Sequence, residues 1–178
     1  MALVVLLRGI NIGGRRTLRP TRLAEQLRHL DAVNVGSTGT LVIRKKVSRA
    51  RLHEEVARRL PFETAIVICE GREIRRLLRR PEMEEPGAAT FVSVLERLPR
   101  TNPKLPLQLP ARGAWLVRLY EREGRFVIGV HRPGAQALSQ LGKLKQLFGV
   151  PGTRRSWNTL EAIGQALAAP APNTPGQC

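Results

Sequence analysis

LVVLLRGINIGGRR, residues 3–16, decides the fold that we expect for this chain. The unbroken apolar run Leu3–Leu7 predicts a short buried strand, and it lacks the basic leader of a signal peptide. A glycine-containing loop follows at residues 9–16, and Pro20 then suits the first turn of a helix. This order of strand, loop and helix indicates the start of a mixed α/β (α+β) protein.

The expected elements occur in two similar series along the chain. In the first half we expect strands at 3–8, 32–35, 40–44 and 64–69, and helices at 20–30, 48–60 and 72–80. In the second half we expect strands at 89–95, 115–120 and 125–130, a returning segment at 150–156, and helices at 135–148 and 158–168. Prolines disfavour a regular helix at 99–110. The pattern predicts two tandem β-α-β-β-α-β halves, the ferredoxin-like arrangement.

The boundaries of these halves follow from composition. Residues 82–87 combine turn formers with a local acidic run, which indicates a connector. We therefore expect an N-terminal half at 1–81 and a C-terminal half at 88–168. Three prolines among the last ten residues predict a disordered tail at 169–178.

The chain is strongly basic. Its 178 residues include 30 Lys and Arg against 14 Asp and Glu, which gives a formal net charge of +16. Each half carries +8, so the excess does not reside in a tail. Such a charge attracts polyanions through phosphate contacts. Because arginine predominates over lysine, a coding bias would produce the same excess, and charge alone does not assign a nucleic-acid partner.

Cysteines and histidines offer no recognisable catalytic or metal pattern. Cys69 and Cys178 form neither a disulfide framework nor a metal-binding spacing, which suits a reducing cytoplasm. No apolar run approaches the roughly 18–20 residues of a membrane span. His29, His53 and His131 have no carboxylate or cysteine at metal or triad spacing. We expect a cytoplasmic protein without metal, cofactor or membrane partner, and whether it is an enzyme stays open.

The loop after the first strand is the first candidate anion site. Its glycines permit close backbone approach to a ligand, and its arginines add positive charge. The spacing does not match the dinucleotide fingerprint or the P-loop, which disfavours NTP hydrolysis by that route. The alternative is a tight turn with solvated arginines. The candidate residues are Arg8, Gly9, Asn11, Gly13, Gly14, Arg15 and Arg16.

Two further segments have both a binding and a structural interpretation. The turn Ser37-Thr38-Gly39-Thr40 places hydroxyls beside the first loop to hold a phosphate or sugar, or it is a plain hairpin turn. Near the end of the chain, Trp157 either stacks on a base while Arg154 and Arg155 hold phosphate, or anchors the core while Asn158 caps a helix.

Five arginines predict a basic stripe on one helical face. Their spacing of i, i+3, i+4, i+7 and i+8 places the guanidinium groups together, where they would follow a phosphate backbone. A solvated helix face is the alternative. The five are Arg72, Arg75, Arg76, Arg79 and Arg80.

The two ends of the chain resemble a known family. Arg-Gly-Ile-Asn-Ile-Gly-Gly at 8–14 and Thr-Arg-Arg-Ser-Trp-Asn-Thr-Leu at 153–160 are similar to the opening and closing segments of the bacterial domain of unknown function 1697. The resemblance spans about residues 3–167. It implies two related ferredoxin-like halves, a bacterial cytoplasmic location and no established activity.

This chain departs from that family's pattern at two places. Ser37-Thr38-Gly39-Thr40 replaces a usual Gln-Ser-Gly-Asn turn, and a hydroxyl lacks the paired donor and acceptor of an amide. Ala137-Leu138-Ser139 lies where an Arg-Ser-Lys segment is expected. Any ligand site that uses those groups is altered here.

Two functional hypotheses remain. The first is phosphate or nucleic-acid binding, to RNA or DNA, without catalysis, through the stripe and the first loop. The alternative is a small-molecule enzyme that binds a phosphorylated metabolite or nucleotide in the crevice between the halves. In that case Arg8 and Asn11 would bind the phosphate with the Gly13 and Gly14 amides, and Arg154 would reach it from the second half.

Overall fold

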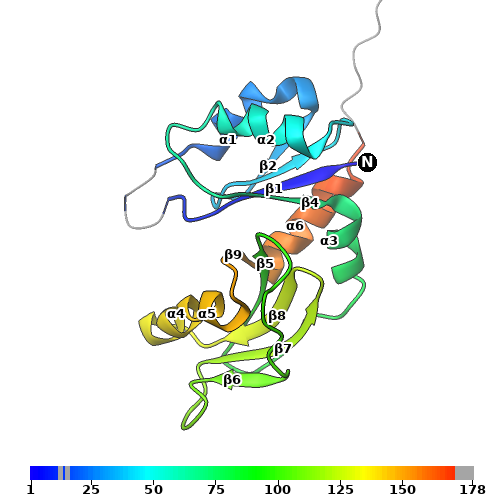
Figure 1. Ribbon diagram of the computed structural model, residues 1–178. Helices are drawn as coiled ribbons and strands as arrows, with labels where there is room; N and C mark the ends of the chain where they lie inside the picture. Colours follow the sequence, from blue (N-terminus) through cyan, green and yellow to red (C-terminus); the bar gives the residue numbers. More distant parts are fainter. Residues whose placement is uncertain (12–13, 15–16, 171–178) are drawn as a thin grey trace, which may run out of the picture.

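The computed structural model describes residues 1–11, 14 and 17–170. It contains two antiparallel β-sheets, one from each half of the chain, with helices packed against both (Figure 1). The mixed α and β class predicted from the sequence is confirmed. None of the described helices is both long and apolar enough to cross a membrane. The predicted disordered tail falls mainly on 171–178, outside the described residues.

The first sheet comprises β1 (Leu3–Leu7), β2 (Ala32–Val35), β3 (Thr40–Ile43) and β4 (Ile66–Glu70). Its order is β2-β3-β1-β4, and all neighbours are antiparallel. Its outer face packs against α1 (Pro20–Gln26), the 3-10 helix η1 (Arg28–Leu30) and α2 (Arg49–Ala57). The opening run is apolar throughout because β1 is central and buried on both faces.

The second sheet comprises β5 (Ala89–Leu95), β6 (Leu107–Leu109), β7 (Val117–Glu123), β8 (Phe126–His131) and β9 (Gly152–Ser156). Its order is β6-β7-β8-β5-β9, so its last four strands repeat the order of the first sheet. Helices α4 (Ala135–Gly142) and α5 (Leu144–Phe148) cover its outer face. Along the chain, the edge strand β6 follows β5 at the point where α1 follows β1 in the first half. Proline explains this difference, since it removes a backbone donor and interrupts a helix.

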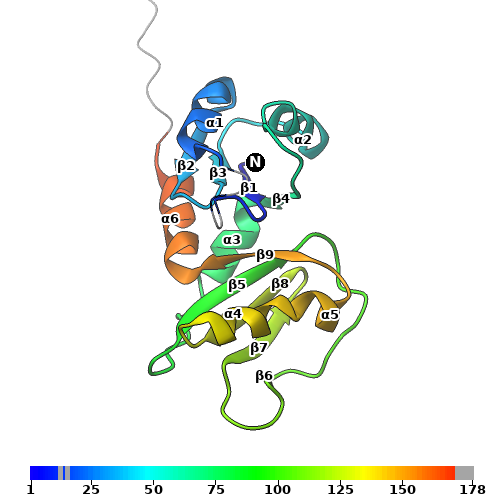
Figure 2. The same ribbon diagram turned by 90° about the vertical axis from the view of Figure 1, so that its left-hand side faces the viewer.

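Two helices lie between the sheets, α3 (Gly71–Leu77) and α6 (Trp157–Ala168) (Figures 1 and 2). Their apolar side chains join the inner faces of both sheets in one core. Helix α6 contacts β2 and β3 of the first half as well as β5 and β9 of its own. The halves therefore share buried apolar surface. The helical members of this core are Ile74, Leu77, Trp157, Leu160, Ile163 and Leu167.

Several helix ends differ from the prediction. Helix α3 begins at Gly71 with a capping box between Glu70 and Glu73, but it ends at Leu77, so the predicted helix at 72–80 is too long. The predicted helix at 135–148 is divided at Lys143. Helix α6 is capped by Ser156, whose hydroxyl accepts from Thr159 N at 3.3 Å; the predicted cap at Asn158 is wrong.

The turn between β2 and β3 yields a test of backbone conformation. Gly36 and Gly39 both have left-handed φ values, +67° and +70°. A Cβ at position 39 would lie 2.5 Å from Ile10 Cδ1, whereas one at position 36 would meet nothing within 4 Å. We expect Gly36→Ala to lower the free energy of unfolding by about 1 kcal/mol, the cost of the left-handed conformation alone. Gly39→Ala should cost at least about 2 kcal/mol, because the clash adds to that strain.

Denaturant unfolding of both variants measures this difference. Equal losses at the two positions would contradict a steric role for Gly39.

Candidate functional site

Strand β9 directs two consecutive arginines to opposite faces, because successive side chains of a strand alternate. Arg155 is 5% exposed and contacts the first half. Arg154 is exposed and lines a pocket with Ser93, its register partner on β5. Figure 2 shows β9 at the edge of the second sheet nearest to the first half. One residue therefore joins the halves and the other faces solvent between them.

The Arg155 guanidinium is a buried polar contact between the halves, and Arg125 makes another polar contact between them by donating from Nη2 to Ile68 O at 2.9 Å. Arg155 Nε donates to Thr40 Oγ1 at 2.7 Å, and its Nη2 donates to the carbonyl oxygens of Leu7 and Thr38, each at 2.9 Å. Its Nη1 donates to two acceptors within β9, each at 2.8 Å. An arginine side chain has five N–H donors, so every donor has a protein acceptor.

Burial lowers the pKa of Arg155 to about 10, and the group stays charged at neutral pH. Carbonyl and hydroxyl oxygens surround it, and none of the ion pairs among the described residues includes it. A buried charge is tolerated when hydrogen bonds replace its hydration. The predicted phosphate-binding role of Arg155 does not fit this geometry, because no N–H is left for a ligand.

The first loop and the β2–β3 turn also use their polar groups internally. Asn11 Nδ2 donates to Ser37 O at 3.0 Å, and Leu18 N donates to Asn11 Oδ1 at 2.9 Å, so Asn11 connects the loop to the turn. Thr38, Gly39 and Thr40 supply acceptors to Arg155. This favours the structural interpretation of the turn and of Asn11. Gly9 and Gly14 adopt left-handed φ values, while Gly13, Arg15 and Arg16 lie outside the described residues.

A pocket of about 200 Å³ lies between the halves, and we call it the interhalf pocket. Arg8 from the end of β1 lines it together with Ser93 and Arg154 from the second sheet. The junction of α4 and α5 closes another side and contributes Lys145. The remaining lining residues are Leu141, Gly142, Leu144, Pro151 and Gly152. Arg8 and Arg154, which were predicted to meet at one crevice, both line this pocket.

The electrostatics of the interhalf pocket are positive. Arg8 Nη1 lies 2.9 Å from Glu96 Oε1, and both side chains are partly exposed. Arg154 and Lys145 form no ion pair with any other described residue. Partial burial lowers the pKa of Arg154, because protein replaces some of the water around its charge. Three cationic side chains therefore line one small volume, and among the described residues Glu96 is the carboxylate paired with one of them.

Two polar residues that line the interhalf pocket, Ser93 and Lys145, were not predicted from the sequence. Ser93 is an unremarkable serine in an apolar strand, and only the pairing of β5 with β9 places it beside Arg154. Lys145 follows a break between two helices, whereas the apolar periodicity of the sequence predicts a single helix there. A search for small polar residues inside buried strands would have found Ser93. No sequence signal places Lys145 beside Arg8.

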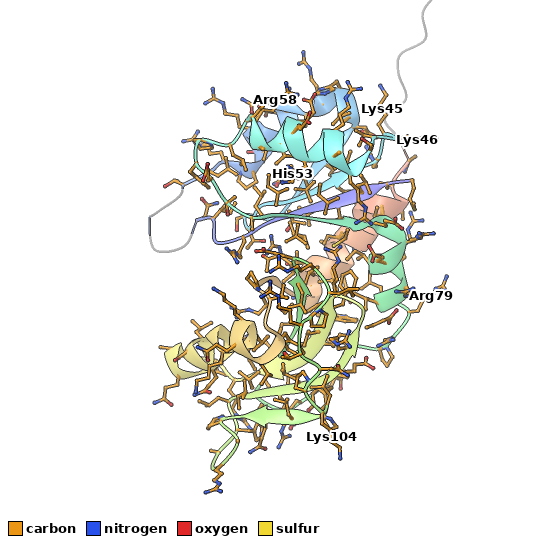
Figure 3. The ribbon with its side chains drawn as sticks, in the orientation of Figure 1. Lys45, Lys46, His53, Arg58, Arg79 and Lys104 are labelled. Atoms are coloured by element: carbon orange, nitrogen blue, oxygen red, sulfur yellow. The ribbon has the colours of Figure 1, made fainter. Side chains whose placement is uncertain are left out.

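The predicted arginine stripe is largely exposed, but it does not follow one helix and most of its guanidinium groups already have partners. Helix α3 ends before Arg79 and Arg80, so the five residues do not share one helix. Arg76 and Arg80 pair with Glu123 of β7, and Arg80 also pairs with Glu121. Arg72 pairs with Glu70, and Arg75 donates to Leu167 O at 2.7 Å. Most of the stripe thus connects α3 to neighbouring elements, whereas Arg79 extends outward (Figure 3).

Trp157 and Asn158 separate in the structure. The Trp157 side chain belongs to the central core and is 4% exposed, so it cannot stack on a nucleic-acid base. Asn158 is exposed in the first turn of α6. The core-anchor interpretation of Trp157 fits, and the base-stacking interpretation does not.

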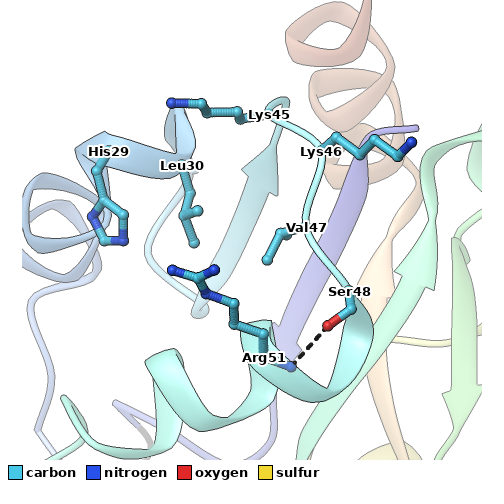
Figure 4. A pocket seen from close by; sticks show the side chains of 7 residues that line it. All are labelled: His29, Leu30, Lys45, Lys46, Val47, Ser48 and Arg51. Atoms are coloured by element: carbon cyan, nitrogen blue, oxygen red, sulfur yellow. Dashed lines mark hydrogen bonds between the residues drawn. The ribbon is translucent and has the colours of Figure 1, made fainter.

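A second basic hollow, which we call the outer pocket, has a volume of about 730 Å³ and lies among η1, the β3–α2 loop and the start of α2 (Figure 4). Its rim carries His29, Lys45 and Arg51, and Leu30 and Val47 form its apolar base. Lys45, Lys46 and Arg58 lie on the same outer side of the first half (Figure 3). No motif in the sequence indicated this hollow.

The described residues contain no group of three His, Cys, Asp or Glu side chains placed to hold a metal ion. Cys69 belongs to β4 and is buried in the central core, and this burial raises the pKa of its thiol to about 12. A thiol that remains protonated at neutral pH is a poor nucleophile. The side chains gathered at the pockets are thus mainly cationic donors.

The family model described as "Protein of unknown function (DUF1697)" matches residues 1–122, more than half of the sequence. The chain belongs to the DUF1697 family. No curated protein matches this DUF1697 sequence.

A solved structure of similar fold is that of the conserved bacterial protein SP0830 from Streptococcus pneumoniae. It is 20% identical, with a TM-score of 0.59 over 93% of this chain and 98% of that one. At this identity the likeness concerns the fold alone.

The contact made by Arg155 can be tested against its neighbour. Arg155→Met removes the hydrogen bonds that Arg155 donates to the first half: Thr40 Oγ1 and Thr38 O lose this donor, and Leu7 O keeps, among the described side-chain donors, only the hydroxyl of Thr153 at 3.4 Å. Because each buried acceptor left unpaired costs about 1–3 kcal/mol, we expect a loss of about 3 kcal/mol or more in unfolding free energy.

Arg154→Met is the matched control, with the same change at an exposed position of the same strand. We expect a change of less than about 0.5 kcal/mol for it. Similar losses in the two variants, measured by denaturant unfolding, would contradict the assigned role of Arg155.

Proposed function

We propose that this DUF1697 protein binds a phosphate-bearing small molecule in the interhalf pocket. The observation that carries the proposal is the convergence of Arg8, Lys145 and Arg154 from separate elements on one pocket. Arginine presents a planar set of donors that matches phosphate oxygens, and lysine adds a mobile ammonium group. A phosphate would thereby meet donors from both halves.

Two further features support a phosphate ligand. The Ser93 hydroxyl forms no hydrogen bond to another described residue, so it can donate to a phosphate oxygen at the pocket wall. The pocket is smaller than the roughly 300–1,000 Å³ typical of drug-sized ligands, which suits a compact anion. Partial desolvation of Arg154 strengthens its attraction for a charged group.

Binding without catalysis is the simplest role for this pocket. None of its described lining residues is a histidine, cysteine, aspartate or glutamate, the usual general acids, bases and nucleophiles. We also propose a cytoplasmic location, as the cysteine pattern predicts. Phosphorylated metabolites are abundant in the cytoplasm.

Phosphate titration tests the proposal. In calorimetry with inorganic phosphate or pyrophosphate at constant ionic strength, we expect Arg154→Ala and Lys145→Ala each to weaken binding about tenfold or more, because hydrogen bonds to charged groups contribute about 1.5–3 kcal/mol. Arg112→Ala and Lys104→Ala remove the same charges from exposed sites and should leave affinity within about twofold. Equal weakening of binding in all four variants would show that net charge attracts phosphate without a defined site. No binding by the parent protein would refute the proposal.

A second candidate function, polynucleotide binding, is favoured by the outer pocket. Lys45, Lys46 and Arg51 form no ion pair with any other described residue, and no carboxylate lines the pocket. Cations gathered in this way contact a phosphate backbone and release its counterions. In this account the nucleic acid would lie against the outer helices of the first half rather than along α3.

A matched pair of triple variants tests this second candidate. Fluorescence anisotropy across a salt series measures the affinity for RNA or DNA. For the Lys45→Ala/Lys46→Ala/Arg51→Ala variant we expect a shallower slope of log affinity against log salt, by the amount that about three phosphate contacts contribute. The control Arg97→Ala/Lys104→Ala/Arg112→Ala variant removes equal charge from the second half. The same decrease in both would show attraction by net charge without a defined surface.

A further inference from the structure

A larger pocket adjoins the interhalf pocket and shares Arg8 with it. We call it the apolar pocket; its volume is about 640 Å³, and it lies between the end of α2 and the segment that leads into β4. Its apolar lining is formed by Ala57, Leu60, Pro61, Phe62 and Ile66. Its polar lining consists of Arg8, the exposed imidazole of His53, Glu63 and Thr64.

Arg8 is fixed between the two pockets by its backbone and its side chain. Arg8 N donates to Ala65 O at 3.1 Å, and the Thr64 hydroxyl donates to Arg8 O, so the backbone is attached to the wall of the apolar pocket. The guanidinium reaches Glu96 of the second half. A ligand phosphate bound by Arg8 therefore has an apolar surface on one side and further cations on the other.

The two volumes differ in the chemistry that they accommodate. The interhalf pocket gathers the cations Arg154 and Lys145, whereas the apolar pocket adds an aromatic ring and aliphatic side chains to its polar members. Pockets that bind organic ligands combine a mainly apolar lining with a few polar groups that fix orientation. Inorganic phosphate alone would leave the apolar pocket unused.

From this juxtaposition we infer that the ligand is an aromatic phosphate monoester, with its phosphate in the interhalf pocket and its ring in the apolar pocket. The inference rests on the proposed phosphate-binding function and adds the class of the organic group. Phe62 offers an aromatic contact to the ring of the ligand. An arginine beside that ring can contact both the ring face and the phosphate. Arg8 occupies the position that such a role requires.

Ala57 permits a test that leaves the charges unchanged. It is exposed at the end of α2 and lines the apolar pocket, so Ala57→Trp places a large ring there. Ala50 is an exposed alanine of the same helix that does not line the pocket, and Ala50→Trp is the matched control. Thermal unfolding of both variants verifies that each remains folded.

The experiment compares inorganic phosphate with phenyl phosphate by calorimetry. We expect the parent protein and Ala50→Trp to bind phenyl phosphate about tenfold or more tightly than inorganic phosphate, since the ring adds buried apolar surface. Ala57→Trp should reduce this ratio to about one and leave the affinity for inorganic phosphate unchanged. Arg154→Ala should weaken the binding of both compounds.

Each outcome distinguishes the inference from the function on which it rests. Binding of both compounds with equal affinity by the parent protein would overturn the inference and leave phosphate binding intact, whereas binding of neither would overturn both. A preference that survives in Ala57→Trp would also overturn it, because the ring would then lie elsewhere.

The NMR signals of His53 give an independent readout, assigned with His53→Gln. They should shift with phenyl phosphate and not with inorganic phosphate. Unchanged signals at saturation with phenyl phosphate would overturn the placement of the ring.

Discussion

The buried guanidinium of Arg155 donates more hydrogen bonds from one half to the other than any other described side chain. Apolar contacts with α3 and α6 stabilise the central core, but they do not fix one orientation by themselves, because hydrophobic contacts are non-directional. Arg155 adds directed hydrogen bonds from an edge strand of one sheet to the end of β1 and the β2–β3 turn of the other. Leaving these bonds unmade would isolate a charge in the protein interior, so alternative packings of the halves carry a large penalty.

This constraint also produces the candidate site. Once Arg155 faces the first half, strand alternation turns Arg154 to the opposite face, and the register with β5 places Ser93 beside it. The position of the first half then brings Arg8 to the same opening. The contact made by Arg155 and the cationic pocket therefore lie on opposite faces of strand β9. A change at Arg155 would therefore disturb the pocket even though Arg155 does not line it.

Charge in this protein is divided between internal ion pairs and two exposed clusters. Most of the predicted stripe contacts carboxylates or carbonyl groups near α3. The interhalf and outer pockets instead gather cations that have few acidic neighbours. A high net charge therefore does not identify a binding surface, since a guanidinium in an ion pair presents fewer donors to a polyanion. A binding surface is indicated instead by cations that have no carboxylate partner among the described residues.

Local patterns in the sequence determined the α+β class, most strands, the two-part repeat and the absence of a helix in the proline-rich segment, because these depend on short-range periodicity and backbone chemistry. The sequence also indicated Arg8 and Arg154 as candidates for one crevice. Only the tertiary structure decided that Arg155 is buried, that the stripe is largely paired, and that Lys145 and Ser93 join the pocket. Those outcomes depend on contacts between residues far apart in the chain, and spacing along one element carries no information about them.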